Sequence, residues 1–363
     1  MLGSKGIPYM GGIQHYIEHL GARLVQRGHE VVVYGRRQYV AEPALYRGME
    51  RRHSWGLKGK HLDAPTHTLT AAWAARRGGF DVIHIHGSAQ SFVLPLLRRT
   101  TSARTVVTIH GLDWRGRKWN RLASWCMRQA AAAPRRYAHA TTAVSQVLVR
   151  TYEAEFGYAP QFVPTGVEPA GPVPAQMIAE RGLSPNRYVL CVSRLVPEKG
   201  VHHLLEAFRD LDCPYQLVIA GASNYRDPYV QRLQALANDR VQFLGYVQGR
   251  LLAELYSHAY LMVQPSDLEG LPLTVLEALS YGRCVLASDI EPNVEALGGC
   301  GYTFRQGDVA DLRQHLAHLL GHPELVAGEQ QKAQTYIAEE RNWERTADAF
   351  EYLYSQLVER ALG

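Results

Sequence analysis

Two glutamates, Glu269 and Glu277, lie in the segment QPSDLEGLPLTVLEALSYG, residues 264–282. The middle of this segment is predicted to be a helix, because Pro272 suits a first helical position and Gly282 suits the residue just past the end. Apolar side chains would then surround Glu277 on every face of the helix: Leu273, Val275, Leu276, Ala278 and Leu279. Since a buried carboxylate is unfavourable unless donors face it, we expect hydrogen-bond donors around Glu277.

The second carboxylate, Glu269, precedes the same helix by a Gly and a Leu, where the N–H groups of the first turn also point. Two carboxylates beside a helix N-terminus are typical of a site for a ligand that has both hydroxyl groups and negative charge. The alternative is structural: Glu269 would cap the helix, and Glu277 would be satisfied by protein groups. The spacing by itself favours neither interpretation.

Two cations, Arg194 and Lys199, lie between a predicted strand end and the next helix, in CVSRLVPEKGVHHLLEAF. An Arg fork and a Lys point charge, with Gly200 opening the helix, are the groups that a diphosphate requires. Gly221, in VIAGAS, follows another predicted strand and belongs to a loop at the same sheet edge. Basic residues are common at strand ends, so the two cations alone do not define a site.

The first half of the chain supplies further candidates. Gly11 and Gly12 stand at the entrance of a strongly periodic helix, where their backbone N–H groups could approach an anion. His110, in TVVTIHGLDW, follows a predicted strand, although a lone histidine there is more often structural than catalytic. Only Met1 and Leu2 stand before the opening loop, so we expect most of the first strand of this domain to be missing.

Short apolar, β-branched runs alternate with helical ones along the chain, which predicts parallel sheets covered by helices on both faces. The predicted strands are residues 30–34, 81–86, 105–110, 140–145, 161–164, 187–193, 215–220, 241–243, 259–264, 284–288 and 301–304. At 363 residues the chain exceeds what one core usually organises. We therefore expect two α/β domains, joined by a linker over the Pro- and Gly-rich residues 166–186.

The composition is that of an ordinary globular protein. The five cysteines have no metal-like spacing, and no apolar run approaches the length of a membrane span. We see no aspartate pair spaced to hold a metal. These features predict a cytosolic protein with no metal site.

Charge is divided unevenly between the two halves. Residues 1–165 carry 23 Lys and Arg against 9 Asp and Glu, a net +14, whereas the rest carries 16 against 25, a net −9. The basic half indicates an anionic partner such as a phosphate-bearing acceptor, nucleic acid or the cytoplasmic membrane leaflet. A solvated Arg-rich surface is the alternative.

The segment DWRGRKWNRLASWCMRQA, residues 113–130, interleaves tryptophans with basic residues. This composition suits a membrane-interface helix or an acceptor platform. The alternative is an amphipathic helix whose tryptophan face packs on its own domain.

Several segments together resemble the donor half of the family 4 retaining glycosyltransferases, in order and spacing: SRLVPEKG, VIAGAS, VQFLGYV and EGLPLTVLEALSYGRCVLASDIEPNVEAL. The segments GIPYMGGIQHYIEHLGARLVQRGHEVVVY, TIHGLDW and VPTGVEP are similar to the other half of that family, although Thr165 stands where Asn is common. The resemblance implies the α/β GT-B architecture, two Rossmann-like domains facing across a cleft. It implies an acceptor-side domain over 1–165, a nucleotide-sugar domain over 187–345, and a C-terminal helix, 346–363, crossing back to the first domain.

Carried over residue by residue, the resemblance implies that Glu277 binds the ribose hydroxyls of a nucleotide sugar. Glu269 would hold hydroxyls of the transferred sugar and stabilise charge at the reacting face. Arg194 and Lys199 would neutralise the departing diphosphate, which leaves poorly unless preorganised donors meet its developing charge.

Backbone N–H groups at Gly12, Gly270 and Leu271 would assist at the diphosphate. His110 resembles the histidine that lies near the outer hydroxyls of the sugar. The resemblance implies no metal and no cofactor beyond the nucleotide-sugar cosubstrate. Retention without an obvious nucleophile suggests front-face displacement, in which the leaving phosphate accepts the proton of the acceptor.

We therefore expect a transferase that moves a sugar to a glycan or lipid-linked acceptor in cell-envelope or exopolysaccharide synthesis. It would be cytoplasmic, in peripheral contact with anionic lipid at the inner face of the membrane through its basic half, and would bind no nucleic acid. Three alternatives remain: a sugar-nucleotide epimerase or a phosphorylase of the same architecture, and a non-catalytic nucleotide-sugar-binding protein. An epimerase would convert its donor without an acceptor, whereas a phosphorylase would require phosphate or pyridoxal phosphate.

Overall fold

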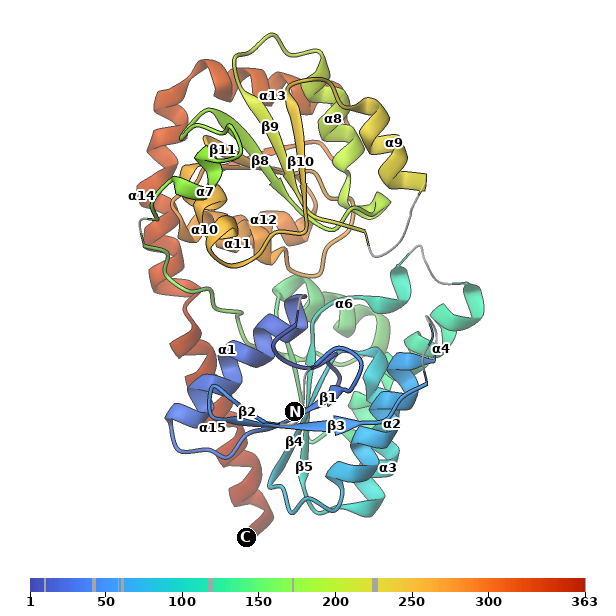
Figure 1. Ribbon diagram of the computed structural model, residues 1–363. Coiled ribbons are helices and arrows are strands. Elements are labelled where there is room, and N and C mark those ends of the chain that lie inside the picture. Colours follow the sequence, from blue (N-terminus) through green and yellow to red (C-terminus); the bar gives the residue numbers. More distant parts are fainter. Residues whose placement is uncertain are drawn as a thin grey trace. The chain divides into compact units, whose positions relative to one another are not determined.

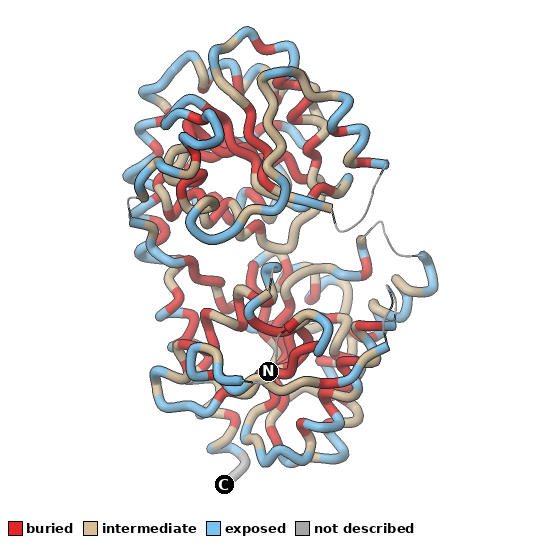
Figure 2. Tube along the Cα trace, in the orientation of Figure 1, coloured by how far each residue is buried: buried red, intermediate tan, exposed pale blue. Residues whose placement is uncertain are grey.

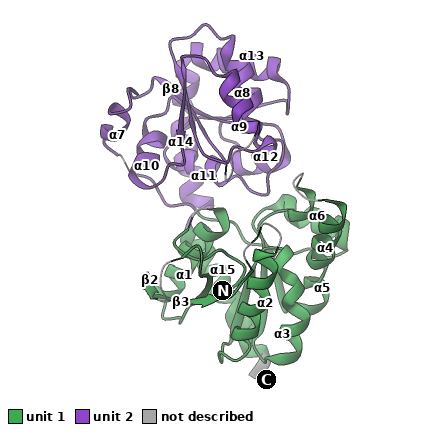
Figure 3. Ribbon diagram, turned by 45° about the vertical axis from the view of Figure 1, so that its right-hand side comes forward, with its two compact units in different colours: residues 1–166, 343–363 green, residues 167–342 purple. Residues whose placement is uncertain are grey.

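The computed structural model describes residues 1–9, 11–40, 44–57, 59, 62–116, 120–171, 173–223 and 228–362. The chain divides into two compact units (Figure 3). Unit 1 comprises residues 1–166 and 343–363, and unit 2 comprises residues 167–342. Each unit is an α/β body with its own sheet and core, and the elements of both are labelled in Figure 1.

The strands of unit 1 form two hydrogen-bonded groups. One has the order β1-β3-β2, with β1 (Val32–Arg36) parallel to β3 (Met49–Ser54), and β3 antiparallel to β2 (Leu45–Tyr46). The other is all parallel, in the order β4 (Val82–His86), β5 (Arg104–Ile109), β6 (Ala140–Ala143) and β7 (Gln161–Phe162). Because β4 and β5 are parallel, His86 at the end of β4 and the loop that follows Ile109 of β5 lie at the same edge of the sheet.

Met1 and Leu2 lie between these two groups. The Leu2 N–H donates to the His84 carbonyl at 2.8 Å, and the His86 N–H donates to the Leu2 carbonyl at 2.9 Å, so Leu2 pairs with β4. On the other side, the Tyr34 N–H donates to the Met1 carbonyl at 3.1 Å. These two residues therefore occupy the position of a strand between β1 and β4, where the sequence predicts a shortened first strand.

The helices of unit 1 are α1 (Gly12–Gln26), α2 (Asp63–Ala75), α3 (Leu94–Thr100), α4 (Arg121–Ala132), α5 (Pro134–Tyr137), α6 (Gln146–Phe156) and α15 (Trp343–Leu362), with 3₁₀ turns η1 (Ala89–Val93) and η2 (Asp113–Arg115). The C-terminal helix α15 packs on α1. Arg27 of α1 pairs with Asp348 at 2.6 Å and with Glu351 at 3.0 Å, and the Trp343 ring stacks on His19. These contacts make the end of the chain part of unit 1.

Unit 2 is built on a six-stranded parallel sheet in the order β10-β9-β8-β11-β12-β13. Its strands are β8 (Tyr188–Val192), β9 (Gln216–Ala220), β10 (Val241–Gly245), β11 (Leu261–Gln264), β12 (Val285–Ser288) and β13 (Tyr302–Phe304). Its helices are α7 (Gln176–Ala179), α8 (Val201–Arg209), α9 (Pro228–Leu236), α10 (Gly249–His258), α11 (Leu273–Ser280), α12 (Glu291–Leu297), α13 (Val309–Gly321) and α14 (Pro323–Glu340), with a 3₁₀ turn η3 (Pro197–Lys199).

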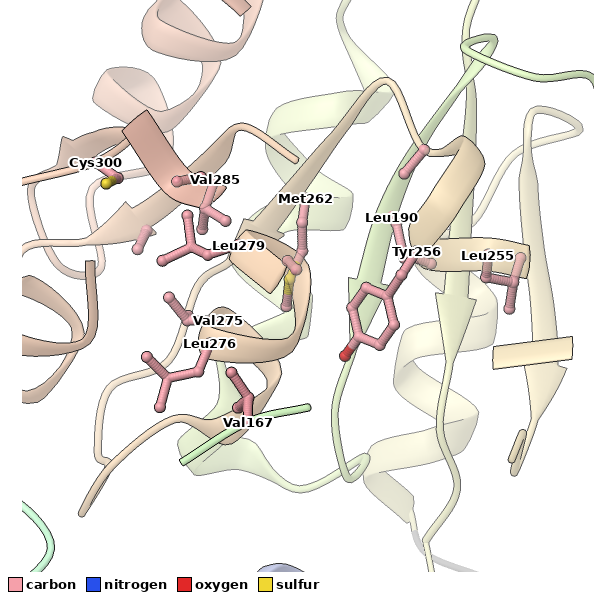
Figure 4. Close-up of a cluster of buried hydrophobic side chains, with 14 of the residues drawn as sticks. Val167, Leu190, Leu255, Tyr256, Met262, Val275, Leu276, Leu279, Val285 and Cys300 are labelled. Atoms are coloured by element: carbon pink, nitrogen blue, oxygen red, sulfur yellow. The ribbon is translucent and has the colours of Figure 1, made fainter. Parts of the chain in front are cut away.

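Both faces of this sheet are buried, as Figure 2 shows for its central strands. Successive residues of β8 point to opposite cores: Leu190 packs with α10, α11 and α14, whereas Val189 and Cys191 pack with α8, α9 and α13. Figure 4 shows the first of these cores, where Leu279 of α11 lies among side chains of the sheet. This double coverage explains the continuous apolar runs of the strands.

Each of the eleven predicted strand segments overlaps an observed strand, whereas β2 and β3 were not predicted. The sequence of β3, MERRHS, is mostly polar, so it lacks the apolar pattern of the other strands. Residues 166–186, interpreted above as a linker, contain α7 and contribute Val167, Ile178 and Leu183 to the core of unit 2. In the described part of the chain, every helix is too short or too polar to cross a bilayer.

Candidate functional site

The helix predicted around Glu277 is α11, and it begins one residue later than predicted, with Pro272 at the N-cap. Gly282 follows its end with φ 65°, and its N–H donates to the Leu279 carbonyl at 2.9 Å. Burial of Val275, Leu276, Ala278, Leu279 and Ser280 fixes the helix against the sheet. The helix therefore holds Glu277 in place by packing on the side chains around it.

A donor faces Glu277, as the sequence predicts. The hydroxyl of Tyr256 on α10 donates to Glu277 Oε2 at 2.9 Å. Burial, together with the adjacent Glu277 carboxylate, raises the pKa of Tyr256 well above its ordinary value, so the hydroxyl stays protonated and remains a donor. The Tyr281 ring stacks on Tyr256 with centroids 5.6 Å apart. Glu277 is thus a half-buried carboxylate with an oriented partner.

Glu269 lies in a cage of donors that gather on one of its two oxygens. Its Oε1 accepts hydrogen bonds from Lys199 Nζ at 2.5 Å, Ser266 Oγ at 2.7 Å and Gln264 Nε2 at 2.9 Å. The side chain is 7% exposed. Within the described residues, no hydrogen bond reaches the other oxygen, Oε2. One carboxylate oxygen is therefore fixed by the protein while the second keeps its capacity to accept.

The sequence interpretation missed two of the three residues that hold Glu269, namely Gln264 and Ser266. Gln264 and Ser266 are fully buried at the end of β11, and the side-chain amide oxygen of Gln264, Oε1, accepts from Thr274 Oγ1 at 3.1 Å. Because Thr274 lies in the first turn of α11, the Gln264 amide is oriented by the helix that carries Glu277. A polar Gln-Pro-Ser run directly after an apolar strand was the available signal.

The two predicted cations differ in their surroundings. Lys199 ends the 3₁₀ turn η3 and pairs with Glu269, and its side chain is 15% exposed. Arg194 is exposed, and its guanidinium makes no side-chain hydrogen bond in the part of unit 2 that the structure describes. The structure therefore joins Lys199 directly to Glu269, two residues to which the sequence gave separate roles.

Gly221 has a structural requirement of its own. Its N–H donates to the Gly245 carbonyl at 2.7 Å, and a Cβ there would lie 1.7 Å from the Ser193 carbonyl oxygen. The backbone approach of β9 to the end of β8 thus requires glycine. Gly270 and Leu271 lie half-buried between Glu269 and α11.

In unit 1, Gly11 and Gly12 are exposed at the start of α1. Gly11 has φ 128°, a conformation that other residues rarely adopt, so the loop can turn sharply into the helix. The His15 N–H donates to the Gly11 carbonyl at 3.0 Å, which closes the first turn. The backbone N–H groups that precede His15 in the first turn of α1 point out of the helix end, as in any helix.

His110 follows β5, is half-buried, and lies next to the fully buried imidazole of His86. Its Nε2 lies 3.2 Å from His86 Nδ1, and the edge of the Tyr16 ring packs against it with centroids 4.8 Å apart. Burial lowers the pKa of His110 to about 3 and that of His86 well below its ordinary value. His110 is therefore neutral near pH 7, with one ring nitrogen as donor and the other as acceptor.

A second set of hydrogen bonds supports the neighbouring histidine of β4. His84 Nδ1 bonds to the Tyr354 hydroxyl of α15 at 2.6 Å, and its Nε2 bonds to Thr108 Oγ1 at 2.6 Å. Thr108 Oγ1 in turn bonds to Thr142 Oγ1 at 2.8 Å. The sequence interpretation gave neither His84 nor Tyr354 a place in a site, because the two residues lie far apart in sequence.

Residues 113–130 had two interpretations in the sequence, an exposed interface helix or a helix whose tryptophan face packs on its own domain, and the described residues of this segment include examples of both. Trp114 is 7% exposed and packs against Tyr152 and Phe156, as in an ordinary core. In contrast, Leu122 and Trp125 on α4 are 69% and 60% exposed. Arg117, Lys118 and Trp119 lie outside the described residues. Among the residues that are described, no three or more His, Cys, Asp or Glu side chains are grouped to hold a metal ion.

Known proteins resemble both halves of the chain. Residues 176–343 match the family Glycosyl transferases group 1, and residues 10–170 match Glycosyltransferase Family 4. The chain is 28% identical over 353 residues to the GDP-mannose-dependent alpha-(1-6)-phosphatidylinositol monomannoside mannosyltransferase of Mycolicibacterium smegmatis, covering 88% of each chain.

Solved structures resemble the fold over nearly its whole length. Sucrose-phosphate synthase from Thermosynechococcus elongatus aligns with a TM-score of 0.82 at 20% identity, covering 96% of this chain and 94% of that one. Anabaena HepE in complex with UDP and glucose aligns with a TM-score of 0.79 at 17% identity, covering 95% and 96%. At these identities the likeness concerns the fold.

Proposed function

The chain belongs to the family 4 glycosyltransferases of the GT-B fold, and from this premise we propose that it transfers mannose from GDP-mannose to a lipid-linked acceptor with retention of configuration. The family membership supports a nucleotide-sugar donor. The name of the mycobacterial relative supports GDP-mannose as the donor and a lipid as the acceptor. The cell envelope is then the destination of the product.

The observation that carries the proposal is the arrangement of Glu269. Lys199, Ser266 and Gln264 hold its Oε1, so its Oε2 is left in a defined position to accept from hydroxyl groups of a sugar. A purely structural carboxylate, such as the buried Glu254, is satisfied differently. Both Glu254 oxygens are used, because Oε2 caps α7 through the N–H groups of Met177 and Ile178 and Oε1 accepts from Arg250.

The remaining roles follow from charge. Arg194, whose charge is unpaired by any described side chain, would meet the diphosphate, and Lys199 would bridge the phosphate and Glu269. N–H groups at Gly270 and Leu271 would add donors. Glu277, oriented by Tyr256, would accept from the ribose hydroxyls. Because charge develops on the departing GDP, these groups lower the barrier when they are already in place.

In unit 1, His110 is neutral, so it would serve a sugar hydroxyl as a hydrogen-bond partner and not as a cation. Gly12 would offer backbone N–H groups to the diphosphate at the start of α1. The reaction breaks the bond between the anomeric carbon and the phosphate oxygen and forms a bond to the acceptor oxygen on the same face. The leaving phosphate accepts the acceptor proton, and no metal takes part.

A donor screen tests the proposal. GDP-mannose, UDP-glucose and ADP-glucose are each incubated with a glycolipid acceptor, and release of the nucleoside diphosphate is measured with and without EDTA. We expect release from GDP-mannose that depends on the acceptor and persists in EDTA, and NMR of the product should show the α anomer. Turnover of none of these donors, with Glu269→Gln indistinguishable from the wild type, would refute the proposal.

A further inference from the structure

His86, the last residue of β4, has a completely buried imidazole to which the proposed function gives no role. Its Nδ1 lies 3.2 Å from Nε2 of His110, so the two rings share one hydrogen bond. Its Nε2 is buried too, and among the described residues no hydrogen-bond partner reaches that nitrogen. The side chain of His86 therefore bonds to His110 and to no other described group.

The ring of His86 is held in place by its neighbours. The His84 ring packs on it with centroids 4.0 Å apart, and the Tyr16 ring contacts it with centroids 5.7 Å apart. The backbone is fixed as well, because the His86 N–H donates to the Leu2 carbonyl at 2.9 Å. A Cβ on Gly3 would lie 2.3 Å from the His86 carbonyl oxygen, so the opening loop passes too close to His86 for a larger residue. A side chain that is locked by packing in this way can orient the group to which it bonds.

His110 uses one of its two ring nitrogens within the protein. Its Nε2 faces His86, whereas no hydrogen bond from the described part of the chain reaches its Nδ1. His110 is half-buried, in contrast to the fully buried His86. The Nδ1 of His110 is therefore the ring nitrogen that is left for a ligand.

Both imidazoles are neutral near pH 7, so the proton between them can be arranged in two ways. In the first arrangement His86 donates from Nδ1, and its buried Nε2 is an acceptor without a partner. In the second arrangement His110 donates from Nε2, and the proton of His86 lies on Nε2 as a buried N–H without an acceptor. Orphaned buried donors are rarer in proteins than acceptors that lack a partner, so the first arrangement is favoured. It leaves the proton of His110 on Nδ1.

We propose that His86 is a positioning residue that keeps His110 in the Nδ1–H tautomer, so that His110 donates a hydrogen bond to an oxygen of the transferred sugar. The contact with the sugar rests on the proposed function, whereas the tautomer of His110 does not. A ring nitrogen that donates recognises a lone pair of the sugar oxygen, and one that accepts would require the proton of a hydroxyl. His86 would thus decide which property of the sugar His110 recognises, without touching the sugar itself.

Nitrogen NMR of the full chain, carrying isotope-labelled histidine, measures the tautomer near pH 7 in the absence of any donor. Long-range couplings between the ring protons and the ring nitrogens distinguish a protonated nitrogen from an unprotonated one. Signals of the pair are assigned by their loss in His86→Leu and in His110→Ala. We expect a protonated Nδ1 and an unprotonated Nε2 for both histidines, and a mixture of tautomers for His110 in His86→Leu. A wild-type His110 that carries its proton on Nε2 would overturn the inference.

Steady-state kinetics, with GDP-mannose or with the donor that the screen identifies, test the effect on the reaction. His86→Leu should lower kcat/KM about tenfold. His86→Asn should recover most of this loss, because its side-chain amide keeps an N–H donor close to the position of Nδ1. In the His110→Ala background, His86→Leu should have no further effect, because His86 acts through His110. An equal loss with and without His110 would show that His86 supports only the fold, which contradicts the proposal.

Tyr16→Phe is the matched control. The Tyr16 ring packs on both histidines, but its buried hydroxyl has no hydrogen-bond partner among the described residues. Removing the hydroxyl should therefore leave the tautomer of His110 and the value of kcat/KM unchanged. A changed tautomer in Tyr16→Phe would mean that Tyr16, and not His86, places the proton.

Two further measurements separate the possible failures. The thermal unfolding midpoints of His86→Leu and His86→Asn show whether each variant is folded before its kinetics are compared. Addition of GDP-mannose to the labelled wild type should shift the Nδ1 signal of His110 and leave that nitrogen protonated. Loss of the Nδ1 proton on binding would contradict the proposal. A chain that turns over none of the donors would refute the proposed function alone, because the tautomer is measured without a donor.

Discussion

The polar candidates of unit 2 are charged, whereas those of unit 1 are neutral. In unit 2, Lys199 and Glu269 form an ion pair with Arg194 exposed nearby on the same loop. In unit 1, the rings of His86 and His110 share a hydrogen bond, and burial lowers the pKa of both histidines. One unit thus keeps charges ready for an anion, and the other keeps hydrogen-bonding groups that carry no charge.

The difference has a physical cause. The ion pair of unit 2 lies in a loop at the strand ends, where each charge has a partner and partial access to solvent. His86 ends β4 and His110 follows the parallel strand β5, and both rings pack against Tyr16, where burial disfavours a proton on either ring. A charged group can stabilise a leaving diphosphate. A neutral imidazole can position a hydroxyl without competing for that charge.

The largest effect that tests this comparison is expected for Glu269→Gln. The substitution keeps the shape of the side chain but removes its negative charge, so Lys199 loses its ion-pair partner and, on the proposed function, the reacting sugar would lose a carboxylate acceptor. We expect kcat to fall on the order of 10²- to 10³-fold, with a smaller change in the KM for the donor. Steady-state kinetics with GDP-mannose, or with the donor that the screen identifies, measures both constants.

The matched control is Glu206→Gln. Glu206 is a carboxylate of the same unit that pairs with Arg232 at 3.4 Å on the surface. Its loss should leave kcat unchanged. If the two variants behave alike, the charge at Glu269 has no role in the reaction.

The second prediction concerns acid stability. His84 and His86 have an ordinary pKa of 6.5 that burial lowers strongly in the folded state. Below about pH 6.5 the unfolded chain binds more protons than the folded chain, so the stability of unit 1 falls as the pH falls. Each of these histidines can contribute up to about 1.4 kcal/mol per pH unit. In unit 2, His202 is the described histidine whose pKa is clearly lowered.

Tryptophan fluorescence can follow this loss, because all six tryptophans of the chain belong to unit 1. Urea unfolding at pH 7 and at about pH 5 should show a marked drop in the free energy of unfolding of unit 1 by this probe. His84→Gln should flatten the pH dependence. A free energy that stays constant or rises on acidification would show that these histidines are not held neutral.

Much of the fold follows from local pattern. The central strands of the unit 2 sheet, β8, β9, β11 and β12, are apolar runs buried on both faces, and such runs are visible in sequence. The predicted ends of α11 were right to within one residue, because Pro272 and Gly282 have local backbone reasons to be there. The strand β3 escaped prediction because its pairing with β1, and not its composition, makes it a strand.

The sequence could identify candidate site residues by their type and spacing, but it could not predict which atoms contact one another. Spacing drew attention to Glu269, Glu277, Arg194 and Lys199, but which oxygen Lys199 contacts depends on how two loops meet. The hydrogen bond between His84 and Tyr354 joins residues 270 positions apart, so the local sequence pattern around either residue does not predict it.

A third prediction tests the neutral side of the comparison. On the proposed function, His110→Ala would remove a hydrogen-bond partner of the sugar and not a charge, so we expect kcat/KM to fall by about 10- to 100-fold. Because the pKa of His110 is about 3, the wild-type rate should show no ionisation of this residue between pH 6 and pH 8. Loss of a kinetic pKa near 6.5 on substitution would mean that His110 titrates during the reaction.

The smallest effect is expected for the residues that hold Glu269 in place. Gln264→Leu and Ser266→Ala each remove one donor to Oε1 while Lys199 stays paired. The carboxylate would then sample more orientations, so we expect kcat to fall roughly tenfold in each case with the KM little changed. Ser280→Ala is the control, because the Ser280 hydroxyl on α11 bonds to the Glu277 backbone carbonyl and not to a carboxylate. If all three variants lose the same activity, the donors to Glu269 support only the stability of unit 2, and orientation of its charge contributes nothing to the difference between the units.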